Sequence, residues 1–304
     1  MNGAADRRAR QIALLAAGMS AAVGATGLAG WALGAPLLSA AGSSFIPIAP
    51  SAAASLCALG VALALVAVRR APAAAALCGA VVALNAIFRF VEWAAGVPLL
   101  DPDALIVTRP EMFARVPTAR MSPLTAITMS MSGWALVLLA AGARRRAARH
   151  AAGILGIAVA WVAFAVILGY LQGRPLLYGS DVIPMALTTA IGCLAAGAGT
   201  VFAAGLDVVP LAPLVGPSVR ARLLRALVPA TMAAVLVTGL ITSLLGRWGV
   251  APAVLAVLPL LIVTHVVMLL VIAVAGRLGG AIDLAERVLA RSRDELELRV
   301  RERT

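Results

Sequence analysis

Arg89 and Glu92 are the only charged residues deep inside an apolar stretch of this sequence, and Asn85 precedes them on the same stretch. The spacing places all three on one face of a helix. An arginine at the centre of a membrane-spanning helix costs about 2.5–3.5 kcal/mol on insertion scales, so it needs a partner or a route to water. Two interpretations stay open. The face is either a polar ligand or coupling site in a bundle interior, or a structural ion pair between helices.

Other residues that could do chemistry are few. The histidines are His150, among arginines, and His265, which we expect to be a packed, hydrogen-bonded helix residue. A haem held by two histidines needs both at one depth, and zinc needs several ligands. Cys57, Cys78 and Cys193 lie in apolar runs without C-x-x-C spacing. We therefore expect no catalytic residue, no metal site and no cofactor.

Composition indicates which solvent surrounds these residues. Of 304 residues, 62% are hydrophobic and 12% are charged, and the mean hydropathy is +1.01. A soluble domain carries about 25% charged residues, so lipid must surround most of this chain. The net charge of +12 comes from 25 arginines in short clusters between apolar runs. That distribution argues against nucleic acid as a partner, because nucleic-acid binding needs basic residues on one soluble face.

The apolar runs predict an all-α integral membrane fold with eight transmembrane helices, since a span takes about 20 residues. We expect a membrane domain over 1–275 and a cytoplasmic helix over 276–304. The predicted spans are 11–33, 46–68, 74–97, 122–142, 151–172, 182–204, 226–246 and 251–275.

Arginine alternates between the loops that join these spans. Nineteen arginines lie at the N-terminus, in every second loop and after the last span, whereas the opposite loops hold five. By the positive-inside rule, both termini are expected in the cytoplasm of a bacterial inner membrane. The longest loop on the arginine-poor side, 98–121, could receive a periplasmic ligand, but it is too short for a folded sensor domain and is expected to be a solvated connector. Its charged residues are Asp101, Asp103, Arg109, Glu111, Arg115 and Arg120.

A threefold internal repeat covers the first six predicted spans. An aromatic-x-x-Gly-x-Pro-Leu-Leu pattern ends the first, third and fifth spans, and a short pattern ending in alanine opens the second, fourth and sixth. The aromatic favours the membrane interface, and the Gly-x-Pro pair ends the helix. We therefore expect three copies of one helical hairpin, followed by a distinct closing pair. The pattern residues are Trp31, Gly34 and Pro36, then Trp93, Gly96 and Pro98, then Tyr170, Gly173 and Pro175.

Residues 276–304 differ sharply in composition, with seven arginines and six acidic residues and no proline. Opposite charges four residues apart and a thin heptad seam predict a solvated helix that forms a parallel homodimer. The segment stops at Thr304 within this helical pattern, so we expect a continuation.

The ending from Ser292 to Thr304 resembles the signalling helix that precedes the phosphoacceptor region of bacterial sensor histidine kinases. The Met121-Ser-Pro-Leu-Thr-Ala opening and its repeats are similar to multi-spanning input regions of such kinases and of diguanylate cyclases. The resemblance implies an output domain beyond Thr304, through which a response regulator would be reached. No kinase or cyclase motif lies within 1–304.

Three functions compete on these observations. The first is a membrane sensory module that passes a helix movement through 276–304 to an output domain. The second is a small-molecule transporter, because transporters are also built from repeats. The third is a membrane scaffold without a ligand.

Overall fold

The computed structural model describes residues 3–40, 42, 45–96, 103, 107, 112–113, 116–117, 119–173, 182–216, 218–250, 257, 261–265 and 267–269. The chain divides into two compact units, Met1–Val215 and Gly216–Thr304. Seven of the helices in the described residues are long and apolar enough to cross a membrane. These helices suggest a multi-pass membrane protein.

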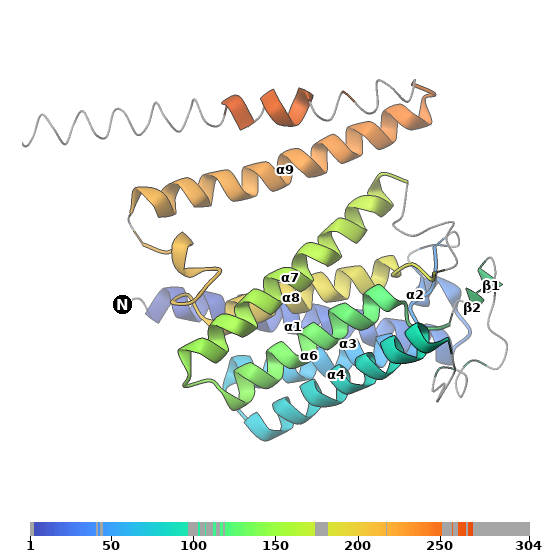
Figure 1. Ribbon diagram of the computed structural model, residues 1–304, viewed down its shortest axis with the longest axis horizontal. Helices are drawn as coiled ribbons and strands as arrows, with labels where there is room; N and C mark the ends of the chain where they lie inside the picture. The colour runs from blue at the N-terminus through green and yellow to red at the C-terminus, as the bar shows by residue number, and fades with distance from the viewer. Residues whose placement is uncertain are drawn as a thin grey trace, which may run out of the picture. The chain divides into compact units, whose positions relative to one another are not determined.

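Unit 1 contains six of the seven long helices, and they lie side by side (Figure 1). The short helix α2 (Pro36–Ser39), the 3-10 turn η1 (Ala212–Leu214) and the paired strands β1 (Met112–Phe113) and β2 (Val116–Pro117) complete its described elements. The long helices are α1 (Gly3–Ala32), α3 (Pro50–Val68), α4 (Pro72–Ala95), α6 (Pro123–Ala141), α7 (Arg146–Leu171) and α8 (Leu187–Ala204).

Unit 2 contains the seventh long helix, α9 (Val219–Arg247), whose first turn is capped by the Ser218 hydroxyl accepting from the Ala221 N–H. The eighth predicted span, 251–275, lies largely outside the described residues, although 261–265 and 267–269 are helical. Among the described residues of unit 2, His265 is exposed, and its Nδ1 lies 2.8 Å from the Leu261 carbonyl oxygen, as expected of a hydrogen-bonded helix residue. The predicted cytoplasmic helix 276–304 lies outside the described residues.

Five helix starts differ from the predicted spans by four residues or more, in two directions. α3 and α8 begin at Pro50 and Leu187, later than predicted, because Pro50 and the lead-in prolines Pro47 and Pro184 disfavour helix in the residues before them. α1, α7 and α9 begin at Gly3, Arg146 and Val219, earlier than predicted, because arginine is a good helix former. At those three starts, the polar residues mark where the apolar stretch ends and not where the helix ends.

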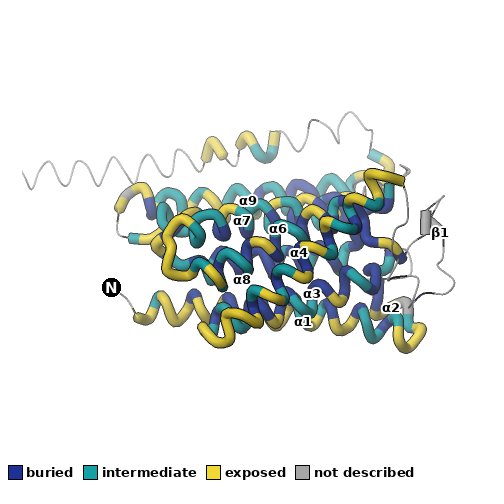
Figure 2. Tube along the Cα trace, turned by 60° about the horizontal axis from the view of Figure 1, so that its bottom comes forward, coloured by how far each residue is buried: buried dark blue, intermediate teal, exposed yellow. Residues whose placement is uncertain are grey.

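The helices of unit 1 form an inner set and an outer set. The inner helices α3, α6 and α8 all contact one another, and each outer helix packs between two of them. α1 packs on α3 and α8, α4 on α6 and α3, and α7 on α8 and α6. At least 50% of the span residues are buried in each inner helix, against 28% in α1 and 44% in α7. Figure 2 shows the buried positions concentrated where the helices face one another.

Each inner helix crosses one outer helix at a glycine. A Cβ added at any of these glycines would fall on a backbone carbonyl oxygen of the outer helix, closer than real Cβ atoms approach. Only glycine allows backbones to come this close. Each contacted residue precedes the aromatic at the end of its own helix by the same number of positions. The pairs are Gly60 with Ala17, Gly133 with Gly79 and Gly197 with Gly156.

The ends of the outer helices also share their backbone geometry. Gly34, Gly96 and Gly173 have φ of +62°, +67° and +67°, the left-handed conformation that glycine adopts without strain. In each case the glycine N–H bonds to the carbonyl of the aromatic three residues before it. Pro36 opens α2, whereas Pro98 and Pro175 lie outside the described residues.

Two of the three aromatics tie an outer helix to the lead-in of an inner one. The Trp31 indole N–H donates to the Ile48 carbonyl at 2.6 Å, and the Tyr170 hydroxyl donates to the Met185 carbonyl at 2.9 Å. Ile48 and Met185 occupy the same position before α3 and α8. Trp93 is 49% exposed and instead packs on Phe90.

Candidate functional site

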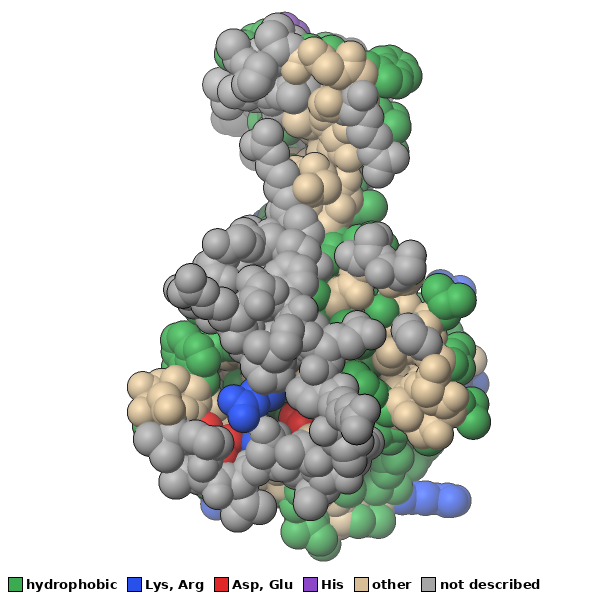
Figure 3. Space-filling model, turned by 90° about the vertical axis from the view of Figure 1, so that its right-hand side faces the viewer, with side chains coloured by type: hydrophobic (Ala, Val, Ile, Leu, Met, Phe, Trp, Pro, Cys, Tyr) green, Lys and Arg blue, Asp and Glu red, His purple; other side chains and the backbone are tan. Residues whose placement is uncertain are grey.

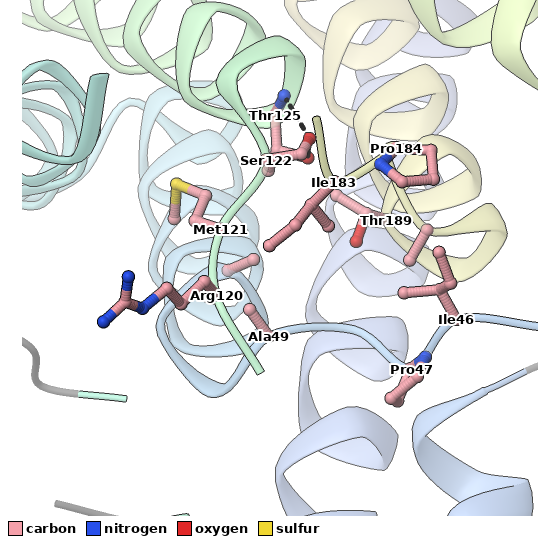
Figure 4. Close-up of a pocket in the computed structure, with 12 residues that line it drawn as sticks. Ile46, Pro47, Ala49, Arg120, Met121, Ser122, Thr125, Ile183, Pro184 and Thr189 are labelled. Carbon is pink, nitrogen blue, oxygen red and sulfur yellow. Dashed lines mark hydrogen bonds between the residues drawn. The ribbon is translucent and has the colours of Figure 1, made fainter. Parts of the chain in front are cut away.

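The starts of the three inner helices enclose a small hollow of about 210 Å³, a volume that includes its open side. We call this space the hollow. Each start contributes its N-cap residue and the residue three positions further on, so the lining repeats around the hollow (Figure 4). These residues are Ala49 and Ala52 of α3, Ser122 and Thr125 of α6, and Ala186 and Thr189 of α8. The lead-in residues Ile46, Pro47, Arg120, Met121, Ile183 and Pro184 complete the lining.

The start of α6 satisfies its own backbone. Ser122 Oγ accepts from the Thr125 N–H at 3.1 Å, and the two hydroxyl oxygens lie 2.8 Å apart. A serine N-cap of this kind supplies one of the hydrogen-bond partners that the first turn of a helix lacks. Pro123 removes another unpaired N–H, because proline has none. Few N–H groups in the first turn of α6 are therefore left without a partner.

The start of α3 is closed by a residue from elsewhere in the chain. Asp103 accepts from the Ser51 N–H at 2.7 Å and from the Ser51 hydroxyl at 2.8 Å, and it is 2% exposed. A carboxylate here also meets the positive end of the helix dipole. The expectation that loop 98–121 is only a solvated connector is therefore wrong at Asp103.

The start of α8 has neither arrangement. Its N-cap is Ala186, which has no side-chain oxygen, and Leu187 stands where the other two helices have proline. Within the described chain, the N–H groups of Leu187, Thr188 and Thr189 have no hydrogen-bond partner. The Thr188 hydroxyl is buried, and none of the described residues forms a hydrogen bond with it. The Thr189 hydroxyl, on a residue that is 2% exposed, also makes no hydrogen bond there and lies against the hollow (Figure 4).

Arg120 lines the mouth of the hollow, but its guanidinium points away from it (Figure 4). Its side chain is exposed and has interactions of its own. Figure 3 looks onto this end of unit 1 and shows basic and acidic side chains in one part of the view. The hollow itself presents hydroxyl groups and apolar carbon, so its polarity comes from neutral donors and helix ends.

Two of the three residues on the predicted polar face of α4 form an ion pair. Arg89 Nη1 lies 2.8 Å from Glu92 Oε2, and their side chains are 8% and 10% exposed. The Arg89 guanidinium also lies over the Phe88 ring, 5.2 Å from its centroid. Asn85 is half-buried, and none of the described residues forms a hydrogen bond with its side chain. The structure thus brings Arg89 and Glu92 together and leaves Asn85 apart.

The opposite end of α8 is held tightly. Arg149 of α7 makes two 2.7 Å bonds to the Asp207 carboxylate, and the Val209 N–H donates to His150 Nδ1 at 3.1 Å. A Cβ at Gly153 would meet the Val209 carbonyl oxygen, and Val208 is fully buried. We call these contacts between α7 and residues 205–210 the clasp. The hydrogen bonds from Arg149 hold the pKa of Asp207 below its usual value of 3.8.

In the part of the chain that the structure describes, no group of three or more His, Cys, Asp or Glu residues could hold a metal ion. The three cysteines are free. Cys193 Sγ lies 3.9 Å from the Thr128 hydroxyl, between α6 and α8.

Sequence reasoning missed the hollow, the Asp103 cap and the clasp. The sequence did contain one signal for the hollow and for the Asp103 cap. Ala49 and Ala186 stand at helix starts, where a serine, threonine, aspartate or asparagine normally caps the first turn. An uncapped start must find its partners elsewhere.

The search for related proteins gives no identification. No known protein-family model, no curated protein and no solved structure matches the chain.

Proposed function

We propose that this chain is the membrane input module of a bacterial signalling protein. Three copies of one helical hairpin form its bundle, and a ligand at the hollow biases the arrangement of α8. Residues 276–304 then pass that change to a cytoplasmic output domain. The resemblance of these residues to a kinase signalling helix favours a histidine kinase over a diguanylate cyclase as the output.

One observation carries the choice of a receptor over a transporter. Further along the inner helices from the hollow, Leu56, Leu59, Leu63, Met129 and Leu136 are at most 1% exposed and belong to one continuous core. A transporter needs a site near the middle of the membrane with access from both sides, commonly built by broken helices. Here α3, α6 and α8 run unbroken and the hollow lies at one end only.

The distribution of arginine supplies the proposed orientation. The hollow lies on the side of the arginine-poor loops, which the positive-inside rule assigns to the outer face of a bacterial inner membrane. The clasp then lies at the cytoplasmic face, beside Arg144, Arg145 and Arg146. A fluorescent protein that matures only in the cytoplasm, fused after Thr304, should fluoresce. A dark fusion with an active periplasmic reporter at the same position would reverse the orientation.

The signalling role is tested by joining residues 1–304 to the catalytic region of a histidine kinase and measuring autophosphorylation in membrane vesicles. Two residues inserted after Gly279 turn a continuous helix by about 200°. Seven residues return it to within about 20° of its original phase. We expect the two-residue insertion to change the phosphorylation rate several-fold and the seven-residue insertion to restore it.

Equal rates in both insertions would argue against a rigid helical connection and hence against this function. Solute uptake by vesicles that contain only residues 1–304 would favour the transporter instead. A ligand that must shift the equilibrium needs different affinity for two arrangements of the bundle. The scaffold hypothesis predicts neither uptake nor a phase-dependent rate.

A further inference from the structure

The three inner helices begin alike in space but differ in their hydrogen bonds. At α6, Ser122 Oγ accepts from the backbone N–H of Thr125 and pairs with its hydroxyl. At α8, Ala186 and Thr189 occupy the same two positions, and the alanine has no oxygen to offer. One acceptor atom is therefore missing at α8, and the space where it would lie opens into the hollow.

The donors around that position point to an oxygen-bearing ligand. Thr189 offers its N–H and its hydroxyl, neither of which has a partner among the described residues. Ser122 and Thr125 share one hydrogen bond between their hydroxyls, so one of the two hydroxyl hydrogens is left to donate. An acceptor placed here would supply the partner that these donors lack among the described residues.

Electrostatics favours a negative charge on that acceptor. The first turns of α6 and α8 both direct positive helix ends at the hollow, and an N-terminus favours an anion. Within this same chain, α3 already holds a carboxylate, that of Asp103, at its own first turn. No described acidic side chain reaches α8 in the same way.

The rest of the lining is apolar, which defines the other half of the ligand. Ile46, Met121 and Ile183 line the hollow with prolines and alanines. Such a surface accepts an alkyl chain and disfavours a second charge, which would lose its hydration without a partner. The enclosed part of the hollow has room for about one oxygen atom, so the rest of a ligand would lie along its open side.

We propose that the start of α8 binds the carboxylate of an aliphatic monocarboxylic acid. One carboxylate oxygen takes the position at α8 that Ser122 Oγ has at α6, accepting from the N–H and hydroxyl of Thr189. The alkyl chain lies against Ile46, Met121 and Ile183. The inference rests on the proposed function, for which it names the class of ligand. The acid comes either from the aqueous phase, as a short chain, or from the bilayer, as a fatty acid.

The test measures binding to the complete chain in lipid nanodiscs, with sodium butyrate and oleic acid as separate probes and butanol as the uncharged control. Thr189→Val removes the hydroxyl with little change of shape, and Thr188→Val is its matched control, because Thr188 does not line the hollow. Ala186→Ser supplies the missing oxygen from the protein itself. Calorimetry gives the affinities, and thermal unfolding shows that each variant is folded.

We expect one of the two acids to bind and butanol to bind much more weakly. Thr189→Val should lower the affinity about tenfold, which is about 1.4 kcal/mol, and Thr188→Val should leave it near that of the parent. Ala186→Ser should raise the unfolding temperature and weaken binding. Butyrate binding identifies a dissolved acid, and oleate binding identifies a lipid source.

The proposal is overturned if neither acid binds, in which case the hollow holds water only, or if butanol binds as well as the acids. It is also overturned if folded Ala186→Ser binds acid as tightly as the parent. This binding assay contains no output domain, so its failure can be told apart from failure of the proposed signalling role, which the phase-dependent phosphorylation rate measures.

Discussion

The two ends of α8 differ in how their backbone and charged groups are satisfied. At the clasp, the Ala204 carbonyl accepts from Arg149 at 3.4 Å, and the chain beyond it is bonded to α7 through Asp207 and Val209. At the hollow, the first turn has no cap and Thr189 has no partner in the described structure. The end of α8 at the clasp is thus held by hydrogen bonds, whereas its first turn at the hollow still has unpaired donors. Binding at the open end would act on a helix whose other end is anchored.

The largest expected effect comes from crowding the clasp. Gly153→Ala places a methyl group against the Val209 carbonyl oxygen, with no side chain that could move aside. We expect a loss of about 1–3 kcal/mol in the free energy of unfolding, as for other overpacked sites. Thermal unfolding in detergent measures it, together with proteolysis of the 205–210 segment.

Gly18→Ala is the matched control for this substitution. Gly18 is an exposed helical glycine of α1 with nothing within 4 Å of an added Cβ. The same change there should stabilise the protein by up to about 1 kcal/mol through helix propensity. If both variants shift the unfolding temperature in the same direction, the clasp is less tightly packed than we describe.

The next largest effect is expected at the start of α3, where a residue of the loop supplies the cap. Asp103→Ala leaves the Ser51 N–H and hydroxyl without their acceptor, and we expect a loss of about 1–2 kcal/mol, as for other N-cap deletions. Asp103→Asn keeps one acceptor oxygen without the charge and should lose less. Chemical or thermal unfolding of the two variants in parallel tests this order, and a neutral Asp103→Ala would contradict the assigned cap.

A smaller effect, of opposite sign, is expected at the open start. Ala186→Ser should raise the free energy of unfolding by about 0.5–1 kcal/mol, because it caps a first turn that has no cap. Ala49→Ser adds the same oxygen at α3, where Asp103 already caps, and should change stability less. Comparable gains in both variants would mean that the two helix starts do not differ.

The smallest expected effect is electrostatic. The Asp207 side chain is 51% exposed, so its ion pair with Arg149 contributes less than about 1 kcal/mol. Because the folded state lowers the pKa of Asp207, this stability is present above the usual value of 3.8 and is lost as the pH falls below it. Asp207→Asn should therefore be less stable than the parent at neutral pH and equal to it in strong acid. Unfolding temperatures measured across this pH range give the difference, and a constant difference would exclude the pair as its source.

Sequence reasoning predicted the helices better than the contacts between them. Apolar runs located all seven long helices of the described chain to within a few residues, except at arginine-rich starts, because a lipid solvent imposes length and composition on a span. Gly60, Gly133 and Gly197 each follow, by seven residues, the alanine that closes the opening pattern of an inner helix, and each is a close backbone crossing in the structure.

The Asp103 cap could not be assigned, because several acids in loop 98–121 were equivalent in the sequence. The clasp depends on a bond between residues far apart, Arg149 and Asp207, and nothing local in either segment marks the other. The hollow depends on the relative position of three helix starts, which hydropathy does not encode. Its asymmetry follows from two alanines, Ala49 and Ala186, of which only the first is compensated by a residue from another segment.

The lengths of the two sets of helices have a consequence for adaptation to different membranes. α3, α6 and α8 have 18 or 19 residues, whereas α1, α4 and α7 have 24 to 30. At 1.5 Å per residue the short helices extend about 28 Å, close to the thickness of the hydrocarbon layer, and non-helical lead-ins continue them. Unbonded backbone at that depth is tolerated only when protein surrounds it, and the longer outer helices form that wall. A thicker or thinner bilayer would therefore be met mainly by α1, α4 and α7, although exposed side chains such as Val61 of α3 and Trp134 of α6 also reach the surface of unit 1.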